Sequence, residues 1–125
     1  MAQGPRSRGV GEPGDVLASL DIAAGQAVIL YLHTPKEKVW GVLLSIGVPG
    51  VVTRCIELNA FDEWLRQEAR GEEPGLGLST VFYPMHRIER MERDETVGGV
   101  EGYADRFARE VGRSVFAVLE IEAAD

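Results

Sequence analysis

The chain has 125 residues, of which 45% are hydrophobic and 26% are charged; these values fit one ordinary globular domain and exclude a collagen-like or wholly disordered chain. No apolar run reaches the ~18 residues that a membrane-spanning helix needs, and the single cysteine, Cys55, excludes an internal disulfide scaffold. Thirteen basic and 20 acidic side chains give a net charge of −7, which disfavours nucleic acid and anionic membranes as partners. Because the first residues also lack the apolar core of a secretory signal, we expect a cytoplasmic protein that does not bind membranes.

The first part of the chain predicts a tail and a short helix. Residues 1–14 hold four glycines and two prolines and too few apolar side chains to offset the entropy of ordering, so we predict a flexible tail. Asp15 then precedes the segment VLASLDIAA, in which Val16 and Leu20 share one helical face. An aspartate there can accept a hydrogen bond from a free backbone N–H, which favours a leading helix that ends near Gly25.

Three strands are predicted next by the two-residue alternation of apolar side chains, over 26–33, 38–46 and 51–58. The segments TPKE and GVPG between them are typical of turns. Gly41 lies inside the second strand, where a glycine often marks a sharp bend or a close backbone approach. Cys55 alternates with apolar neighbours in the third strand, which predicts a small buried side chain.

A helix is predicted over 60–70, where Phe61, Trp64 and Leu65 form an apolar stripe and Asn59 can cap the first turn.

The last part of the chain predicts two more strands and a C-terminal helix. LSTVFY over 78–83 and RIERME over 87–92 predict the fourth and fifth strands. An amphipathic helix is predicted over 101–111. The segment 114–121 is apolar and β-branched, so it predicts either a final strand or a continuation of that helix through Gly112.

These elements together predict a mainly β fold: a small five-stranded SH3-like or Sm-like barrel with a leading short helix, a helical insertion over 60–70 between strands three and four, and a C-terminal helix with a possible strand. We expect the barrel to span residues 15–94 and the C-terminal segment residues 95–125. The stretch from Val28 to Met91 is expected to curl into a closed sheet whose interior is sealed by alternating aliphatic side chains.

Two ordered sets of residues resemble a known family. The first set is a short helix followed by a glycine, alternating aliphatic residues and a strand with an internal glycine: Gly25, Val28, Leu30, Leu32, Gly41, Leu43 and Ile46. The second is VFYPMHRIERM over 81–91, which combines a strand, a two-residue turn and another strand. These resemble the two motifs of the Sm-like superfamily, which includes the Sm, LSm and Hfq-like proteins. The resemblance implies a small β-barrel fold.

The residues that bind RNA in that family are mostly absent from this chain. Gly47 stands at the position of an acidic residue of the family's base pocket. The Arg-Gly pair of the Sm proteins would fall at Pro84-Met85. In Hfq-like proteins the corresponding stretch reads Lys-His-x-Ile, which His86 and Ile88 match and Met85 does not.

One basic and aromatic cluster is a candidate contact surface for RNA or another ligand: Tyr83, His86, Arg87 and Arg90. Arginine can pair with phosphate, and an aromatic ring can stack on a base. Glu89 and Glu92 interleave with the arginines, however, and such charges on adjacent strands form ordinary cross-strand ion pairs. An RNA-binding riboregulator of the Sm-like type is therefore the alternative hypothesis rather than the leading one.

The sequence predicts no metal site, no cofactor and no catalytic centre. Its histidines and Cys55 lack the paired spacing of metal ligands, and no serine lies in a GxSxG elbow. A small enzyme of unknown reaction, with Cys55 or His86 in a pocket, stays open as a further alternative.

Strands four and five would form the open edges of such a barrel, and open edges must be covered or used. We expect self-association through these edges, with Thr80 and Phe82 on one strand and Ile88 and Met91 on the other. The Sm-like resemblance implies the same contact, because that family pairs these two strands between subunits. The leading hypothesis is a non-enzymatic binding or assembly module that forms a homo-oligomer. A different protein as a further partner stays open as an alternative.

Overall fold

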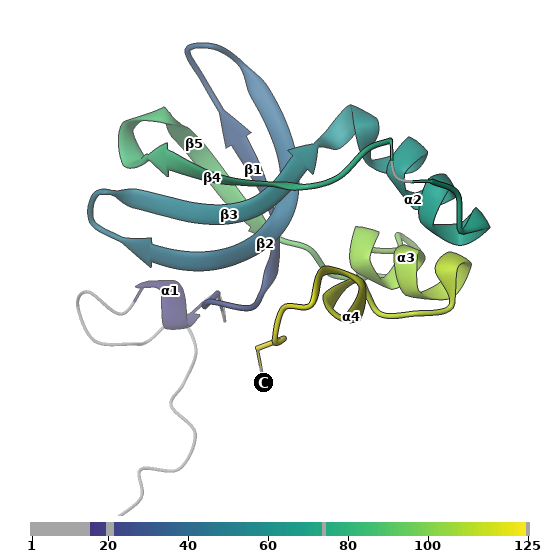
Figure 1. Cartoon of the computed structure of the whole chain (residues 1–125). Coiled ribbons are helices and arrows are strands. Elements are labelled where there is room, and N and C mark those ends of the chain that lie inside the picture. Colours follow the sequence, from purple (N-terminus) through teal and green to yellow (C-terminus); the bar gives the residue numbers. More distant parts are fainter. Residues whose placement is uncertain (1–15, 20–21, 74, 125) are drawn as a thin grey trace, which may run out of the picture.

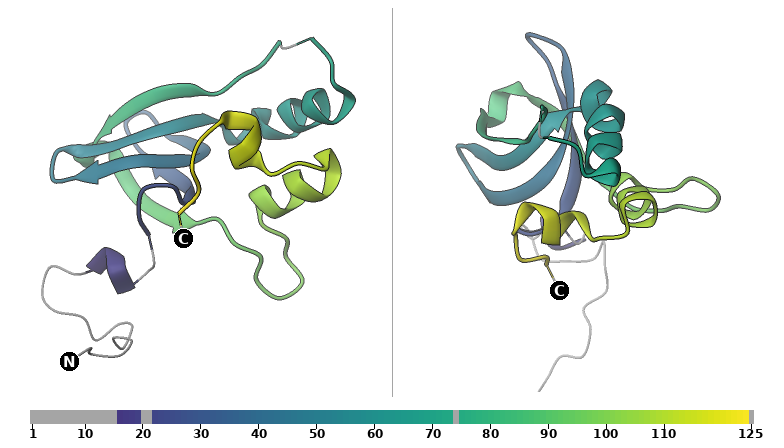
Figure 2. Two further views of the ribbon diagram at one scale, coloured as in Figure 1. Left: turned by 60° about the horizontal axis from the view of Figure 1, so that its bottom comes forward. Right: turned by 45° about the vertical axis from the view of Figure 1, so that its right-hand side comes forward.

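The computed structural model describes residues 16–19, 22–73 and 75–124; the predicted tail over 1–14 and the predicted cap Asp15 lie outside these residues. The elements of the described part are, in chain order, α1 (Val16–Ser19), β1 (Ala27–Leu32), β2 (Glu37–Gly47), β3 (Gly50–Glu57), η1 (Leu58–Ala60), α2 (Phe61–Arg70), β4 (Ser79–Pro84), η2 (Met85–Arg87), β5 (Ile88–Arg93), α3 (Tyr103–Val111) and α4 (Val115–Leu119). Each predicted strand is present with ends within one residue of the predicted ones. The helices α2, α3 and α4 gather at one side of the sheet (Figure 1 and Figure 2).

The strands of the described chain form one curved antiparallel sheet in the order β4-β3-β2-β1-β5 (Figure 1). The predicted mainly β, barrel-like architecture is therefore confirmed. The predicted closure of the barrel is wrong, because within the described residues β4 pairs only with β3 and β5 pairs only with β1. Pro84 has no backbone N–H to donate, and η2 then redirects the chain, so β5 returns along β1 rather than along β4.

The sheet buries side chains on both of its faces. The inner face carries the alternating residues of the predicted interior: Val28, Leu30, Leu32, Val39, Leu43, Val51, Cys55 and Tyr83. The opposite face of the central strands packs against the helices through a second cluster: Ala27, Ile29, Trp40, Val42, Ile56, Phe61, Trp64, Leu65, Phe107 and Val115. The two-residue period seen in the sequence thus separates two cores, and the predicted burial of Cys55 is confirmed.

Gly41 allows β2 and β3 to approach closely. A Cβ atom on this residue would lie 2.6 Å from the carbonyl oxygen of Arg54 and 2.6 Å from Cβ of Cys55. Both separations are shorter than non-bonded heavy atoms tolerate, so only hydrogen fits at this position. The predicted close backbone approach at Gly41 is confirmed.

The helical layer is joined to the sheet by a cluster of aromatic rings. The ring of Trp40 on β2 meets Phe61 edge-on, with centroids 5.2 Å apart, and Trp64 of α2 stacks on Phe107 of α3 at 4.9 Å. Burial of such rings is a large part of the energy of a small core. The amphipathic helix predicted over 101–111 therefore covers its own sheet.

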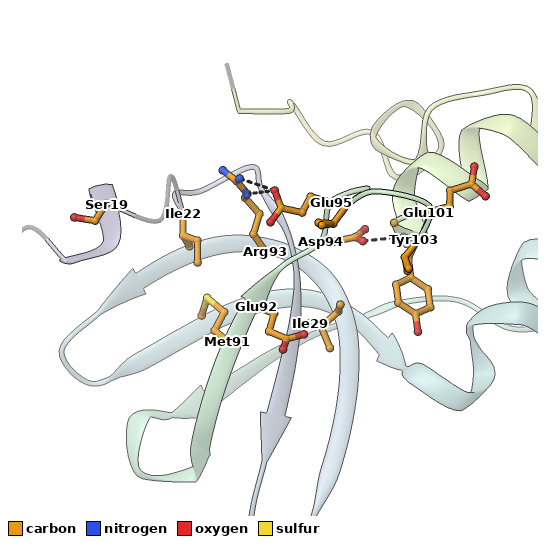
Figure 3. A pocket seen from close by; sticks show the side chains of 13 residues that line it. Ser19, Ile22, Ile29, Met91, Glu92, Arg93, Asp94, Glu95, Glu101 and Tyr103 are labelled. Carbon is orange, nitrogen blue, oxygen red and sulfur yellow. Dashed lines mark hydrogen bonds and ion pairs between the residues drawn. The ribbon is translucent and has the colours of Figure 1, made fainter. Parts of the chain in front are cut away.

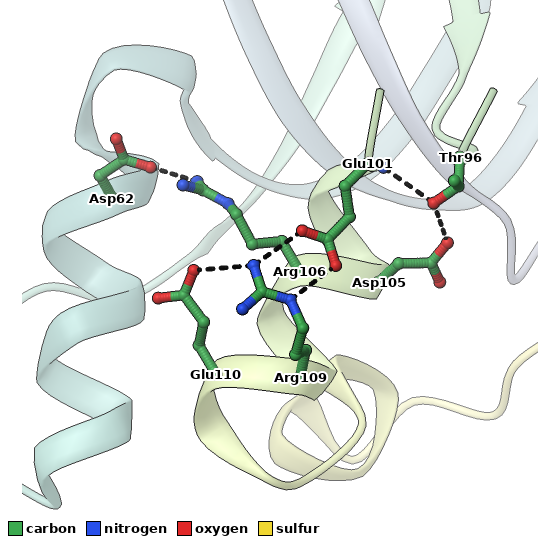
Figure 4. A network of polar contacts seen from close by, with 8 residues as sticks. Asp62, Thr96, Glu101, Asp105, Arg106, Arg109 and Glu110 are labelled. Atoms are coloured by element: carbon green, nitrogen blue, oxygen red, sulfur yellow. Dashed lines mark hydrogen bonds and ion pairs between the residues drawn. The ribbon is translucent and has the colours of Figure 1, made fainter. Parts of the chain in front are cut away.

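Ion pairs add polar links around α3 (Figure 4). Arg106 of α3 pairs with Asp62 of α2. Arg109 makes two hydrogen bonds to the carboxylate of Glu101, of 2.9 and 2.8 Å. Because Glu101 precedes the helix, its pair with Arg109 fastens the segment that enters α3 to the last turn of the helix.

The C-terminal segment contains a second short helix instead of the strand that was one of two predictions for 114–121. The helix α3 ends at Gly112, whose φ of 86° is the left-handed value that favours glycine. The Ser114 hydroxyl then accepts a hydrogen bond of 3.1 Å from the backbone N–H of Phe116 and caps α4. The segment is therefore neither a strand nor a continuation of α3. Gly112 ends α3, and Ser114, two residues later, caps a separate helix.

Candidate functional site

The first candidate edge is β4, which has a strand neighbour on one side only. Its side chains alternate: Val81 and Tyr83 pack into the inner cluster, whereas Thr80 and Phe82 lie on the outer face and are exposed. Phe82 is 52% exposed, a large value for a phenylalanine. The strand carries no charged side chain, so little opposes pairing with another strand.

The second candidate edge is β5, at the other end of the strand order. Ile88 and Met91 pack against the inner cluster. Arg90 lies opposite Tyr31 of β1, and Glu92 lies opposite Ile29, on the outer face. The predicted edge residues Thr80, Phe82, Ile88 and Met91 are thus placed on the two free edges of the described sheet.

A cationic and aromatic cluster lies on the outer face beside β5. The guanidinium carbon of Arg90 is 4.1 Å from the ring centroid of Tyr31, and the ammonium of Lys38 lies 5.4 Å from the same centroid. The Tyr31 hydroxyl donates a 3.0 Å hydrogen bond to Glu92, which also pairs with Arg90 at 3.1 Å. Hydrogen bonding to Tyr31, followed by the nearby charge of Glu92, raises the pKa of Arg90.

Sequence reasoning included Arg90 but missed its partners Tyr31 and Lys38. A signal for Tyr31 was present, since it alternates with the inward residues Leu30 and Leu32 and so belongs to the opposite face. Its contact with Arg90 depends on pairing between β1 and β5, which are about 60 positions apart and whose register no local pattern specifies.

The structure separates the four residues of the predicted RNA-contact cluster. Tyr83 is only 9% exposed and lies on the inner face of the curved sheet, with its hydroxyl 3.9 Å from the sulfur of Cys55. Burial, followed by the effect of Cys55, raises the pKa of this hydroxyl. The ring of Tyr83 is therefore not on the same surface as His86 and Arg90, which are exposed.

Arg87 holds the β1–β2 turn rather than facing open solvent. Its Nε donates a 3.0 Å hydrogen bond to the carbonyl of His33, and one Nη donates a 2.9 Å bond to the carbonyl of Pro35. Glu37 lies 3.8 Å from the same guanidinium. These contacts join η2 to the turn between β1 and β2, so Arg87 has a structural role.

An apolar groove of about 560 Å³ lies between the end of the β2–β3 hairpin and β5. Its lining consists of Ile22, Ile46, Gly47, Val48, Met85, Ile88 and Met91. Met85 follows β4 directly, and Ile88 and Met91 belong to β5, so the groove adjoins both free edges.

A larger cavity of about 830 Å³ lies where β5 leads into α3 (Figure 3). Its central carboxylate, Asp94, accepts hydrogen bonds from the indole N–H of Trp40 at 2.9 Å, from the backbone N–H of Tyr103 at 2.7 Å and from that of Ala104 at 2.8 Å. Both oxygens of Asp94 are therefore engaged in joining the sheet to the helix. Asp94 therefore has a structural role in this cavity.

The features that would support other functional classes are not assembled in the described residues. No group of three or more histidine, cysteine, aspartate and glutamate side chains is placed there to hold a metal ion. The sulfur of Cys55 meets Tyr83 rather than His86. Among the same residues, no helix is both long enough and apolar enough to cross a membrane.

Comparisons with known proteins return no match: no family model, no curated protein and no solved structure resembles this chain closely enough to count.

Proposed function

We propose that the protein is a non-enzymatic assembly module that forms a homo-oligomer by pairing β4 of one copy with β5 of another. The strand order β4-β3-β2-β1-β5 carries this proposal, because it leaves these two strands as the free edges of the described sheet. A free edge presents unpaired N–H and C=O groups, and proteins either block such edges or use them.

The chemistry of the two edges supports pairing between copies. No residue of β4 is charged, and the strand exposes Phe82. The apolar groove beside β5 would lose its exposure to water if a further strand lay along that edge. The Sm-like resemblance of the 81–91 segment agrees with this contact, and membership of that superfamily and a cytoplasmic setting are parts of the same proposal.

RNA binding receives less support from the geometry. Tyr83 is buried on the inner face of the sheet, Arg87 donates hydrogen bonds to two backbone carbonyls and Arg90 is paired with Glu92. The positive charge that attracts phosphate is thus largely engaged within the protein. A small enzyme built on Cys55 or His86 has no observation in its favour.

The test is to block the β4 edge with a charge. Thr80 is exposed on the outer face, where its hydroxyl accepts a 3.3 Å hydrogen bond from Arg54. Thr80→Lys removes this exposed bond and adds a charge that must lose water if the edge is paired, and urea unfolding of the variant checks that it remains folded. We expect at least about tenfold weaker self-association, measured by sedimentation equilibrium. Ala69→Lys adds the same charge at an exposed position of α2 and should associate like the wild type.

Two results would overturn the proposal. One is a wild-type protein that stays monomeric at high concentration in light scattering. The other is equal association of the Thr80→Lys and Ala69→Lys variants, since that would place the contact between copies away from β4.

A further inference from the structure

We infer that Arg90 of β5, which stacks on Tyr31 of β1, also contacts the exposed ring of Phe82 from β4 of a second copy. The guanidinium would then lie between two aromatic rings. This inference rests on the proposed pairing of edges. It names the residues that determine how tightly and in which register the two copies join.

The apolar side chains of both edges fix which faces of the two copies must coincide. Val81 on β4, and Ile88 and Met91 on β5, pack against the inner cluster of their own copy. A second copy joined with its inner face continuous with that of the first would cover the groove beside Ile88 and Met91. Joined the other way round, it would bring the inward residues Val81 and Tyr83 of β4 beside the charged Arg90 and Glu92 on the outer face of β5. Matching inner faces is therefore the favourable arrangement.

Matching inner faces determines which residues meet on the outer face. Phe82 alternates with the inward residues of β4 and lies on the outer face. Arg90 lies on the outer face of β5, opposite Tyr31. Directly opposed residues on one face of an antiparallel pair have Cβ atoms about 5 Å apart, and diagonal neighbours remain within reach of aromatic and long side chains. Phe82 and Arg90 can therefore touch in a continuous sheet.

The structure shows that Arg90 is already ordered for such a contact. Stacking on Tyr31 at 4.1 Å and pairing with Glu92 at 3.1 Å restrict its conformation, yet its side chain remains 59% exposed. A side chain ordered before binding loses less entropy when it binds. Arginine stacks on aromatic faces, and this attraction strengthens when water is excluded.

The experiment compares self-association of the full chain in the wild type, in Phe82→Leu, in Arg90→Lys and in the double variant by sedimentation equilibrium. Phe82→Leu keeps an apolar side chain without the ring, and Arg90→Lys keeps the charge without the planar group. We expect each single variant to associate on the order of tenfold more weakly. The double variant should be hardly weaker than either, because both changes remove one interaction. Phe82→Tyr keeps the ring and should associate like the wild type.

The outcomes separate this inference from the proposed function. If the wild type associates but the two effects multiply in the double variant, or if Phe82→Leu associates like the wild type, the Phe82–Arg90 contact is refuted while edge pairing stands. If the wild type does not associate, both are refuted. Urea unfolding of each variant measures its stability. If Phe82→Leu does not fold, Arg90→Lys still tests the contact, because Arg90 lies on the other strand, β5.

Discussion

Thr53 of β3 is a polar side chain that is fully buried within the curved sheet. Its neighbours in the sheet are Leu43 and Val81, and its buried hydroxyl has no hydrogen-bond partner in the described structure. A buried hydroxyl without a partner has lost its hydration and gained nothing in return. The interior therefore contains one position where an apolar residue of similar shape would fit better.

We predict that Thr53→Val raises the free energy of unfolding by about 1 kcal/mol, because it replaces the unpaired hydroxyl with a methyl group. Urea unfolding monitored by tryptophan fluorescence measures the change. The matched variant Thr80→Val removes an exposed hydroxyl that does have a partner, since it accepts a 3.3 Å hydrogen bond from Arg54, and should therefore not raise stability. A loss of stability in Thr53→Val would show that this hydroxyl has a partner after all.

Among the elements, α3 depends on a carboxylate that comes from outside the helix. Asp94 lies directly after β5 and accepts hydrogen bonds from the first turn of α3 and from Trp40 of β2. The space is tight, since a Cβ on Gly102 would lie 2.9 Å from an Asp94 oxygen. A negative charge at the amino end of a helix is also favoured by the helix dipole.

We predict that Asp94→Ala lowers the free energy of unfolding by about 2–4 kcal/mol, because the partly buried indole N–H and two helix N–H groups lose their acceptor. Asp94→Asn, which retains one acceptor oxygen, should cost less. Glu95→Ala breaks only the ion pair of Glu95 with Arg93, whose side chains are 44% and 33% exposed, and should cost less than about 1 kcal/mol. Equal stability of Asp94→Ala and Glu95→Ala in urea unfolding would contradict this role.

The link between Glu101 and α3 predicts a dependence on pH. Hydrogen bonds from Arg109 lower the pKa of Glu101. A carboxylate with a lowered folded-state pKa contributes stability above its unfolded pKa and loses that contribution as the pH falls through the folded pKa. The difference in stability between wild type and Arg109→Gln should therefore shrink as the pH falls from about 6 to about 3.

The control for this pH dependence is Glu101→Gln, which removes the titrating group itself. Its stability relative to the wild type should follow the same pH profile as that of Arg109→Gln, measured by urea unfolding across the same pH range. A pH-independent difference between wild type and Arg109→Gln would refute the assignment.

At the scale of the whole molecule, the local elements were predictable from sequence and their partners were not. Alternation of apolar residues located each strand, and the apolar stripe of Phe61, Trp64 and Leu65 located α2. These signals are local. A glycine inside a predicted strand also indicated a close approach at Gly41, although the atoms that it approaches belong to β3. The open sheet and the Tyr31–Arg90 contact depend on which strands become neighbours, and a two-residue period does not contain that information. For the same reason, the sequence did not predict that Tyr83 is buried while His86 is exposed.

The two free edges belong to different strands, so they are not interchangeable. In the proposed assembly, a copy that joins through β4 would still offer β5, and each addition would leave one unpaired edge of each kind. Growth would stop only when the last copy meets the first, and the stoichiometry would follow from the angle between successive copies rather than from any residue at the junction. That angle depends on how strongly the sheet curves, so the central strands, which lie away from both edges, would help to determine the number of copies in an assembly of the proposed kind.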